Sequence, residues 1–141
     1  MVIVKKIVLV FGLLFVLLSL CIFEVSFTHN VYSGLMTDAY ILNEYIDFIN
    51  QGVDDNEDKT VTTPHTIGIA DNMLFNWQRH KRWMLSFMHH TVVFELDKAI
   101  IRLHTLVHID MYEDCKVECA TVKNLCFELL QYNKFSVQNI F

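Results

Sequence analysis

The sequence predicts an all-α protein in which an N-terminal single transmembrane helix is followed by a small antiparallel bundle of three or four helices. The 141 residues include only four glycines and one proline, too few for the turns of a β-rich fold. Apolar residues are concentrated in one N-terminal run, and beyond that run they recur at helical steps of three and four. These three observations predict one anchored helical domain rather than several domains.

An apolar segment near the N-terminus predicts the membrane anchor. Within residues 7–23 only Gly12 and Ser19 are not strongly apolar. Seventeen helical residues span about 26 Å, slightly less than the roughly 30 Å hydrocarbon core of a bilayer. We therefore expect residues 7–27 to cross the lipid bilayer once.

The charges on either side of this segment predict its orientation in the cell membrane. Lys5 and Lys6 precede it, whereas the first lysine beyond it is Lys59. By the positive-inside rule, residues 1–6 form a cytoplasmic stub and residues 28–141 form an extracytoplasmic domain.

An uncleaved signal-anchor competes here with a cleaved signal peptide and with a lipidated N-terminus. The end of the apolar run lacks the small-x-small pattern that signal peptidase recognises. The segment ending in Leu20 and Cys21 resembles a lipoprotein cleavage site only in part, because Leu20 stands where a small residue is expected. The uncleaved anchor is favoured, with Cys21 as a small apolar residue inside it.

An amphipathic helix is predicted over residues 32–49, followed by a loop. The apolar residues of the helix are Leu35, Leu42, Tyr45, Ile46 and Ile49. Residues 50–63 include an acidic run from Asp54 to Asp58 and have no apolar period, which predicts a mobile acidic loop. These carboxylates lack the ligand spacing and central glycine of a calcium-binding loop.

Thr63 and Pro64 indicate the start of the next helix, because a capping hydroxyl precedes a proline; a start after Asp71 is the alternative. Its apolar line is formed by Ala70, Leu74, Trp77, Met84 and Met88. The line continues into a heptad stripe formed by Val93, Leu96, Ile100, Leu103 and Val107. The pattern leaves open whether residues 70–109 form one helix or two.

Asp110 and Glu113 have the spacing of a capping box, which predicts that the last helix starts there and ends near Asn133, before an apolar tail over 135–141. One face of this helix carries Cys115, Cys119, Val122, Cys126 and Leu129. Three cysteines on one helix face cannot pair without strain, so we expect them to be buried as small hydrophobes.

A cluster of basic and aromatic residues is the candidate contact surface for a partner. It comprises Trp77, Arg79, Lys81, Arg82 and Trp83. The same pattern fits a solvated helix face, which is favoured over a site for lipid headgroups. The chain has 16 acidic and 11 basic residues, a net charge of −5, which argues against a nucleic-acid partner.

Histidines suggest a weak candidate metal site. His104 and His108 are four residues apart, a spacing that places both imidazoles on one side of a helix. The preceding segment could add four further metal ligands, namely His80, His89, His90 and Glu95. No complete zinc signature is present, so surface histidines are favoured and the sequence predicts no metal or other cofactor.

Motifs for catalysis are absent from the sequence. It contains no Gly-rich phosphate loop, no nucleophile elbow and no metalloprotease helix. Glu95 and Asp97 lie near His90 in sequence, but isolated carboxylates on helices are usually solvated charge. We therefore expect a protein that is not an enzyme.

Several features of the chain occur together in a known family. They are the lysine-flanked anchor, Trp77 with Lys81, Phe87-Met88-His89-His90, the Leu96 to Leu103 stripe with Arg102, and the ending Phe135-Ser136-Val137-Gln138-Asn139-Ile140. The combination resembles an uncharacterised family of short bacterial membrane-anchored proteins called domain of unknown function 4363. The resemblance implies the topology and the helical class, and it implies no activity or cofactor. The positions that it matches are Trp77, His90, Arg102, Asn139 and Ile140.

The sequence therefore predicts a membrane-anchored, extracytoplasmic helical protein with an interaction or accessory role. Its expected partner is another membrane protein or a second copy of itself. A metal-binding or metal-sensing helical domain that uses histidines is the alternative from a different functional class.

Overall fold

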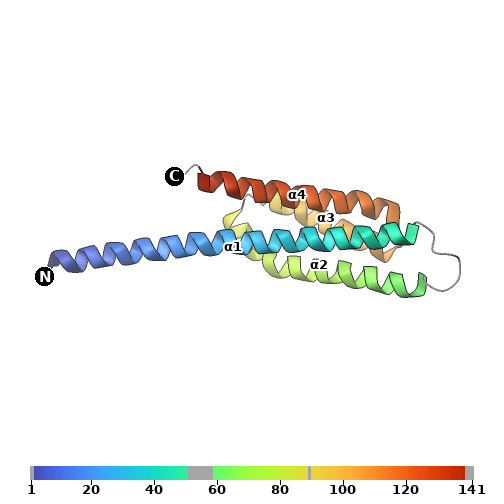
Figure 1. Ribbon diagram of the computed structural model, residues 1–141, viewed down its shortest axis with the longest axis horizontal. Helices are drawn as coiled ribbons and strands as arrows, with labels where there is room; N and C mark the ends of the chain where they lie inside the picture. The colour runs from blue at the N-terminus through green and yellow to red at the C-terminus, as the bar shows by residue number, and fades with distance from the viewer. Residues whose placement is uncertain (1, 51–58, 89, 139–141) are drawn as a thin grey trace.

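A computed structural model describes residues 2–50, 59–88 and 90–138, which form four α-helices and no strand. The helices are α1 (Val2–Asn50), α2 (Lys59–Phe87), α3 (His90–His108) and α4 (Tyr112–Gln138). They alternate in direction, and each packs on its sequence neighbours while α4 closes the ring against α1 (Figure 1). The predicted class, an apolar N-terminal helix followed by an antiparallel bundle, is confirmed, with four helices in the bundle.

Helix α1 belongs to two parts of the molecule. Its N-terminal half is long and apolar enough to cross a membrane, and none of its most apolar stretch is buried. From Thr28 onward the same helix contributes buried side chains to the bundle. Figure 1 shows the first half projecting beyond the bundle, at the end where α4 also terminates. The helix continues through Gly34 without interruption, so its apolar half and the first bundle helix form one rod.

The core lies between the four helices and is built from the predicted stripes. Every predicted stripe residue of α3 and α4 is buried, because the heptad steps keep one face of each helix toward the bundle axis. The predictions for α1 and α2 are correct in part. Four of the predicted stripe residues in these two helices are half-buried instead of buried: Tyr45, Ile49, Leu74 and Met88. Core residues of α1 and α2 that the stripes omitted are Tyr32, Ala39 and Met73.

Helix α2 starts earlier than predicted. It begins at Lys59, so the expected starts at Pro64 and after Asp71 are wrong, and Asn50 belongs to α1 rather than to the loop. Pro64 lies inside the first turns of the helix. Because proline has no backbone N–H, the hydrogen bond to the Thr60 carbonyl is missing. Residues 51–58, with most of the predicted acidic loop, lie outside the described residues.

The segment left open over residues 70–109 forms two helices. Helix α2 ends at Phe87 and α3 begins at His90. The Met88 N–H still donates to the Met84 carbonyl at 2.8 Å, which completes the last turn of α2. The two helices therefore pack side by side instead of forming one long rod.

Asp110 ends α3 instead of capping α4, so the predicted capping box is wrong. Its φ of 58° is left-handed, and its N–H donates to the Val107 carbonyl at 3.3 Å. The Met111 N–H donates to the Leu106 carbonyl at 3.0 Å. These two bonds define a Schellman motif with Asp110 at the position after the helix. Helix α4 then runs from Tyr112 to Gln138, past the predicted end near Asn133 and into the predicted tail.

Candidate functional sites

The expected partner surface on α2 separates into buried and exposed residues. Trp77 is fully buried, which confirms its place on the predicted apolar line and excludes it from the exposed contact surface. Its side chain lies on the core line of α2, and the indole Nε1–H donates to Asp97 Oδ1 on α3 at 2.9 Å. Lys81, one turn later, donates to the other oxygen of Asp97 at 2.6 Å. Trp77 and Lys81 therefore share one carboxylate that joins α2 to α3, and Asp97 is a structural partner rather than solvated charge.

The exposed part of this surface lies beside the point where α1 leaves the bundle. Arg79 and Arg82 are exposed, and 59% of Trp83 is accessible. His80 lies against Phe27 of α1 with ring centroids 5.4 Å apart, which fixes the register of the two antiparallel helices. Trp83, three residues farther along α2, is thus about 4.5 Å nearer the apolar half of α1.

A groove between α1 and α2 opens at the same end of the bundle. Its volume is about 330 Å³, and its lining residues are Phe27, Asn30, Val31, Gly34, Leu35, Asp38, Asn76, Trp77 and His80. A side chain at Gly34 would have free space, because a Cβ there meets no atom within 4 Å. Partial burial raises the pKa of Asp38 above its ordinary value. Neither the spacing of Asp38 nor its neighbours in the sequence indicate a groove.

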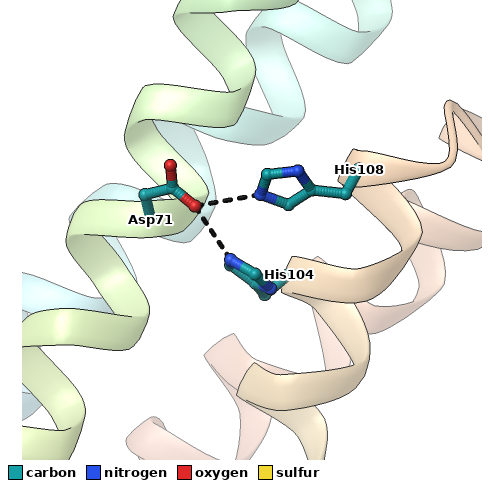
Figure 2. A group of neighbouring side chains, drawn as sticks. All are labelled: Asp71, His104 and His108. Carbon is teal, nitrogen blue, oxygen red and sulfur yellow. Dashed lines mark hydrogen bonds and ion pairs between the residues drawn. The ribbon is translucent and has the colours of Figure 1, made fainter.

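Three polar side chains converge on the opposite flank of α2. Asp71 Oδ1 lies 2.8 Å from His104 Nε2 and 2.9 Å from His108 Nε2 (Figure 2). The two imidazoles lie side by side, one turn apart on α3, with centroids 4.4 Å apart and ring planes tilted by 47°, as their spacing predicted. The hydrogen bonds from His108 and His104 lower the pKa of Asp71. All three donor atoms lie within 4.8 Å of one another, so this is the group that could hold a metal ion among the described residues.

The other expected metal donors do not reach this group. His90 is exposed at the first position of α3, 14 residues and about 21 Å before His104. Glu95 instead forms an exposed ion pair with Lys98 at 2.9 Å. His89 lies outside the described residues. The sequence missed Asp71 because it is 33 residues from His104, and only the packing of α2 on α3 brings them together.

The three cysteines of α4 are buried and free, as predicted. Burial is the main cause that raises the pKa of each thiol, to about 11 for Cys115 and about 12 for Cys119 and Cys126. Such thiols stay protonated at neutral pH and are poor nucleophiles and metal ligands. Cys21 is exposed on the apolar half of α1.

Arg102, another of the family-like positions, also joins two helices. Its Nη1 donates to Glu118 Oε1 on α4 at 2.7 Å. Glu118 is only 7% exposed, and its Oε2 has no hydrogen-bond partner among the described residues. Asn139 and Ile140 lie outside the described part of the chain.

Comparison with known proteins identifies one family. A family model with the description "Domain of unknown function (DUF4363)" matches residues 30–140. The match includes α1 from Asn30 onward and the helices α2, α3 and α4. No curated protein and no solved structure matches the chain.

Proposed function

Because this chain belongs to the DUF4363 family, whose function is unknown, we propose from its structure that it is a single-pass membrane protein with an accessory role. In this proposal the bundle lies outside the cytoplasm and contacts another membrane protein. The role is not enzymatic, in keeping with the absence of catalytic motifs from the sequence.

The exposed apolar half of α1 is the observation that carries the proposal. Its large apolar side chains between Ile7 and Phe23 are about half or more accessible, and the bundle covers none of them. Removing one such side chain from water is worth about 1.5–3 kcal/mol, so the segment as a whole strongly favours an apolar environment. A lipid bilayer supplies that environment, and a continuous helix satisfies its own backbone hydrogen bonds there.

Charge supports the orientation. Lys6 lies on one flank of the apolar segment, and Glu24 and Asp38 lie on the other. The positive-inside rule therefore favours a cytoplasmic N-terminus and an extracytoplasmic bundle.

The surface near the apolar half of α1 supports contact with a membrane partner. The groove between α1 and α2, the exposed Trp83 and the two exposed arginines all lie at this end. A protein in the same membrane meets this end of the bundle first. Aromatic and arginine side chains are also those that contribute most to protein interfaces.

The partner is sought by photo-crosslinking the full-length protein in its native membrane. A photoreactive residue at Gly34 places the probe in the groove, and one at Ala120, exposed on α4, is the control position. We expect one membrane protein to be captured in stoichiometric yield from Gly34 but not from Ala120. Equal capture from both positions would contradict a partner in the groove. Capture of a second copy of this protein would contradict a different membrane protein as the partner and would indicate self-association.

A substitution that fills the groove tests whether that partner needs it. Gly34→Leu should abolish copurification of the captured protein, because the new side chain occupies the groove. Gly68→Leu is the matched control, since a Cβ at Gly68 on α2 also meets no atom within 4 Å. Retention of the partner by Gly34→Leu would overturn the proposed contact. Migration of the protein at its uncleaved mass, together with extraction only by detergent, tests the anchor independently.

A further inference from the structure

We propose that Asp71, His104 and His108 form a site for one divalent transition-metal ion, and that Zn²⁺ bound there ties α2 to the C-terminal end of α3. The three side chains come from two helices that pack against each other. The site lies on the bundle, about 14 Å farther from the apolar half of α1 than His80. It therefore does not depend on the proposed partner surface.

The donor atoms have the chemistry that such ions prefer. Two imidazole nitrogens and one carboxylate oxygen suit zinc and its neighbours in the first transition row. Neither histidine bonds to its own helix backbone through Nε2, because both Nε2 atoms point to the same oxygen of Asp71 (Figure 2). The pair formed by His104 and His108 thus faces a third ligand of a suitable type, the carboxylate of Asp71.

The separations of the Asp71 carboxylate oxygen from the two imidazole nitrogens are close to those between ligands of one metal ion. Ligands at about 2.0–2.1 Å from zinc lie roughly 2.9 Å apart at right angles and about 3.4 Å apart at tetrahedral angles. The observed separations from Asp71 Oδ1 are 2.8 and 2.9 Å. All three donor atoms lie within 4.8 Å of one another, and a neutral imidazole that carries its proton on Nδ1 has its Nε2 lone pair free to bind the ion.

The site is open to solvent on one side. The exposed fractions of the side chains are 54% for Asp71, 39% for His108 and 27% for His104. An ion can enter without opening the bundle, and water can complete its coordination.

Binding of the ion should stabilise the α2–α3 pair. Asp71 lies in the middle of α2, whereas His108 is the last residue of α3 and lies within the Schellman motif that ends this helix. An ion that binds only the folded arrangement stabilises it by mass action. We therefore expect zinc to raise the thermal unfolding midpoint.

Zinc titration of the full-length protein in detergent tests the proposal. After removal of metal with a chelator, calorimetry should show one Zn²⁺ per chain, and Co²⁺ should give visible d–d absorption. Both Asp71→Asn and the double variant His104→Gln/His108→Gln should weaken zinc binding at least tenfold and lose the rise in unfolding midpoint. These substitutions are at accessible positions and keep hydrogen-bonding groups, so the bundle should fold.

Two matched controls make the result specific. His90→Gln removes an exposed histidine of the same helix and should bind zinc like the unchanged protein. His80→Gln removes the histidine near the other end of α2 and should also leave the affinity for zinc unchanged. Zinc binding that survives His104→Gln/His108→Gln, or the lack of any binding at 100-fold excess zinc over protein, would overturn the site. Binding without a rise in unfolding midpoint would overturn the tie between the helices.

Discussion

Asp97 accepts hydrogen bonds from Trp77 and Lys81, which lie one turn apart on α2. The indole is fully buried, so its N–H would have no other partner without this carboxylate. The sequence predicts Trp77 both on the apolar line of its helix and in the basic and aromatic contact surface; burial of the side chain confirms the first prediction and contradicts the second. In the structure those basic residues surround a core position, and the tryptophan stabilises the contact between α2 and α3.

Trp77→Phe should destabilise the bundle by about 1 kcal/mol or more. The change keeps an aromatic ring in the core but removes the hydrogen bond to Asp97 and part of the buried volume. The matched control is Trp83→Phe, which alters an exposed indole and should change the free energy of unfolding by less than about 0.5 kcal/mol. Chemical denaturation of both variants measures the difference. Equal effects would contradict the assignment of a structural role to Trp77.

The buried thiols of α4 give a second prediction at this scale. Their pKa values are raised from the ordinary 9.0 to about 11 or 12, so at pH 8 the thiolate fraction falls by at least about a hundredfold. We expect Cys115, Cys119 and Cys126 to resist alkylation in the folded protein and to react after unfolding. Mass spectrometry of protein labelled with iodoacetamide gives the count of modified thiols.

The raised pKa values of the same thiols should make the stability of the fold depend on pH. The unfolded chain loses their protons near pH 9, whereas the folded chain retains them, so the stabilisation is fully present below pH 9. It is lost as the pH rises through about 11 to 12. Unfolding midpoints measured between pH 8 and 11 should therefore fall. A constant midpoint over that interval would contradict the burial of the thiols.

At the scale of the elements, the end of α3 depends on one residue in a left-handed conformation. Asp110 has a φ of 58°, and its Oδ1 accepts a hydrogen bond from the Tyr112 hydroxyl at 2.7 Å. Aspartate tolerates this conformation better than most residues, and glycine adopts it without cost. The capping box fitted the same two acidic residues, because a pattern of residue types cannot distinguish the end of one helix from the start of the next.

Substitutions at Asp110 should separate backbone strain from side-chain contacts. Asp110→Val should destabilise the protein by roughly 1–2 kcal/mol, since a β-branched residue is strained at positive φ. Asp110→Gly should be at least as stable as the unchanged protein, because relief of strain offsets the lost hydrogen bond. Thermal unfolding of both variants tests this order. A valine variant more stable than the glycine variant would contradict the Schellman motif.

For the whole molecule, the bundle and the apolar half of α1 are expected to be separable. The buried residues of α1 begin at Thr28, and none of the residues from Ile7 to Phe23 is covered by the bundle. A chain that begins at Glu24 should therefore remain helical and unfold cooperatively without detergent. Circular dichroism and size-exclusion chromatography test this. Loss of cooperative unfolding in the shortened chain would indicate that the apolar half of α1 stabilises the bundle.

The sequence predicts the buried residues and the bounds of some helices better than those of others. The stripes of α3 and α4 were correct at every position, because strict steps of three and four leave only one face for the core. The predictions for α1 and α2 were incomplete, since Tyr32 and Met73 are core residues outside the chosen lines. The start of α2 was also misplaced, because proline inside the first turns of a helix resembles proline at its start.

The sequence by itself determined the helical class, the apolar N-terminal helix and the burial of the cysteines. These follow from composition and from periodicity along single helices, which act over a few residues. Only the tertiary structure decided which helix lies beside which, and hence that Trp77 meets Asp97 and that Asp71 meets His104. Such pairs depend on the register between antiparallel helices, and that register is set by the packing of the whole core rather than by the spacing within either helix.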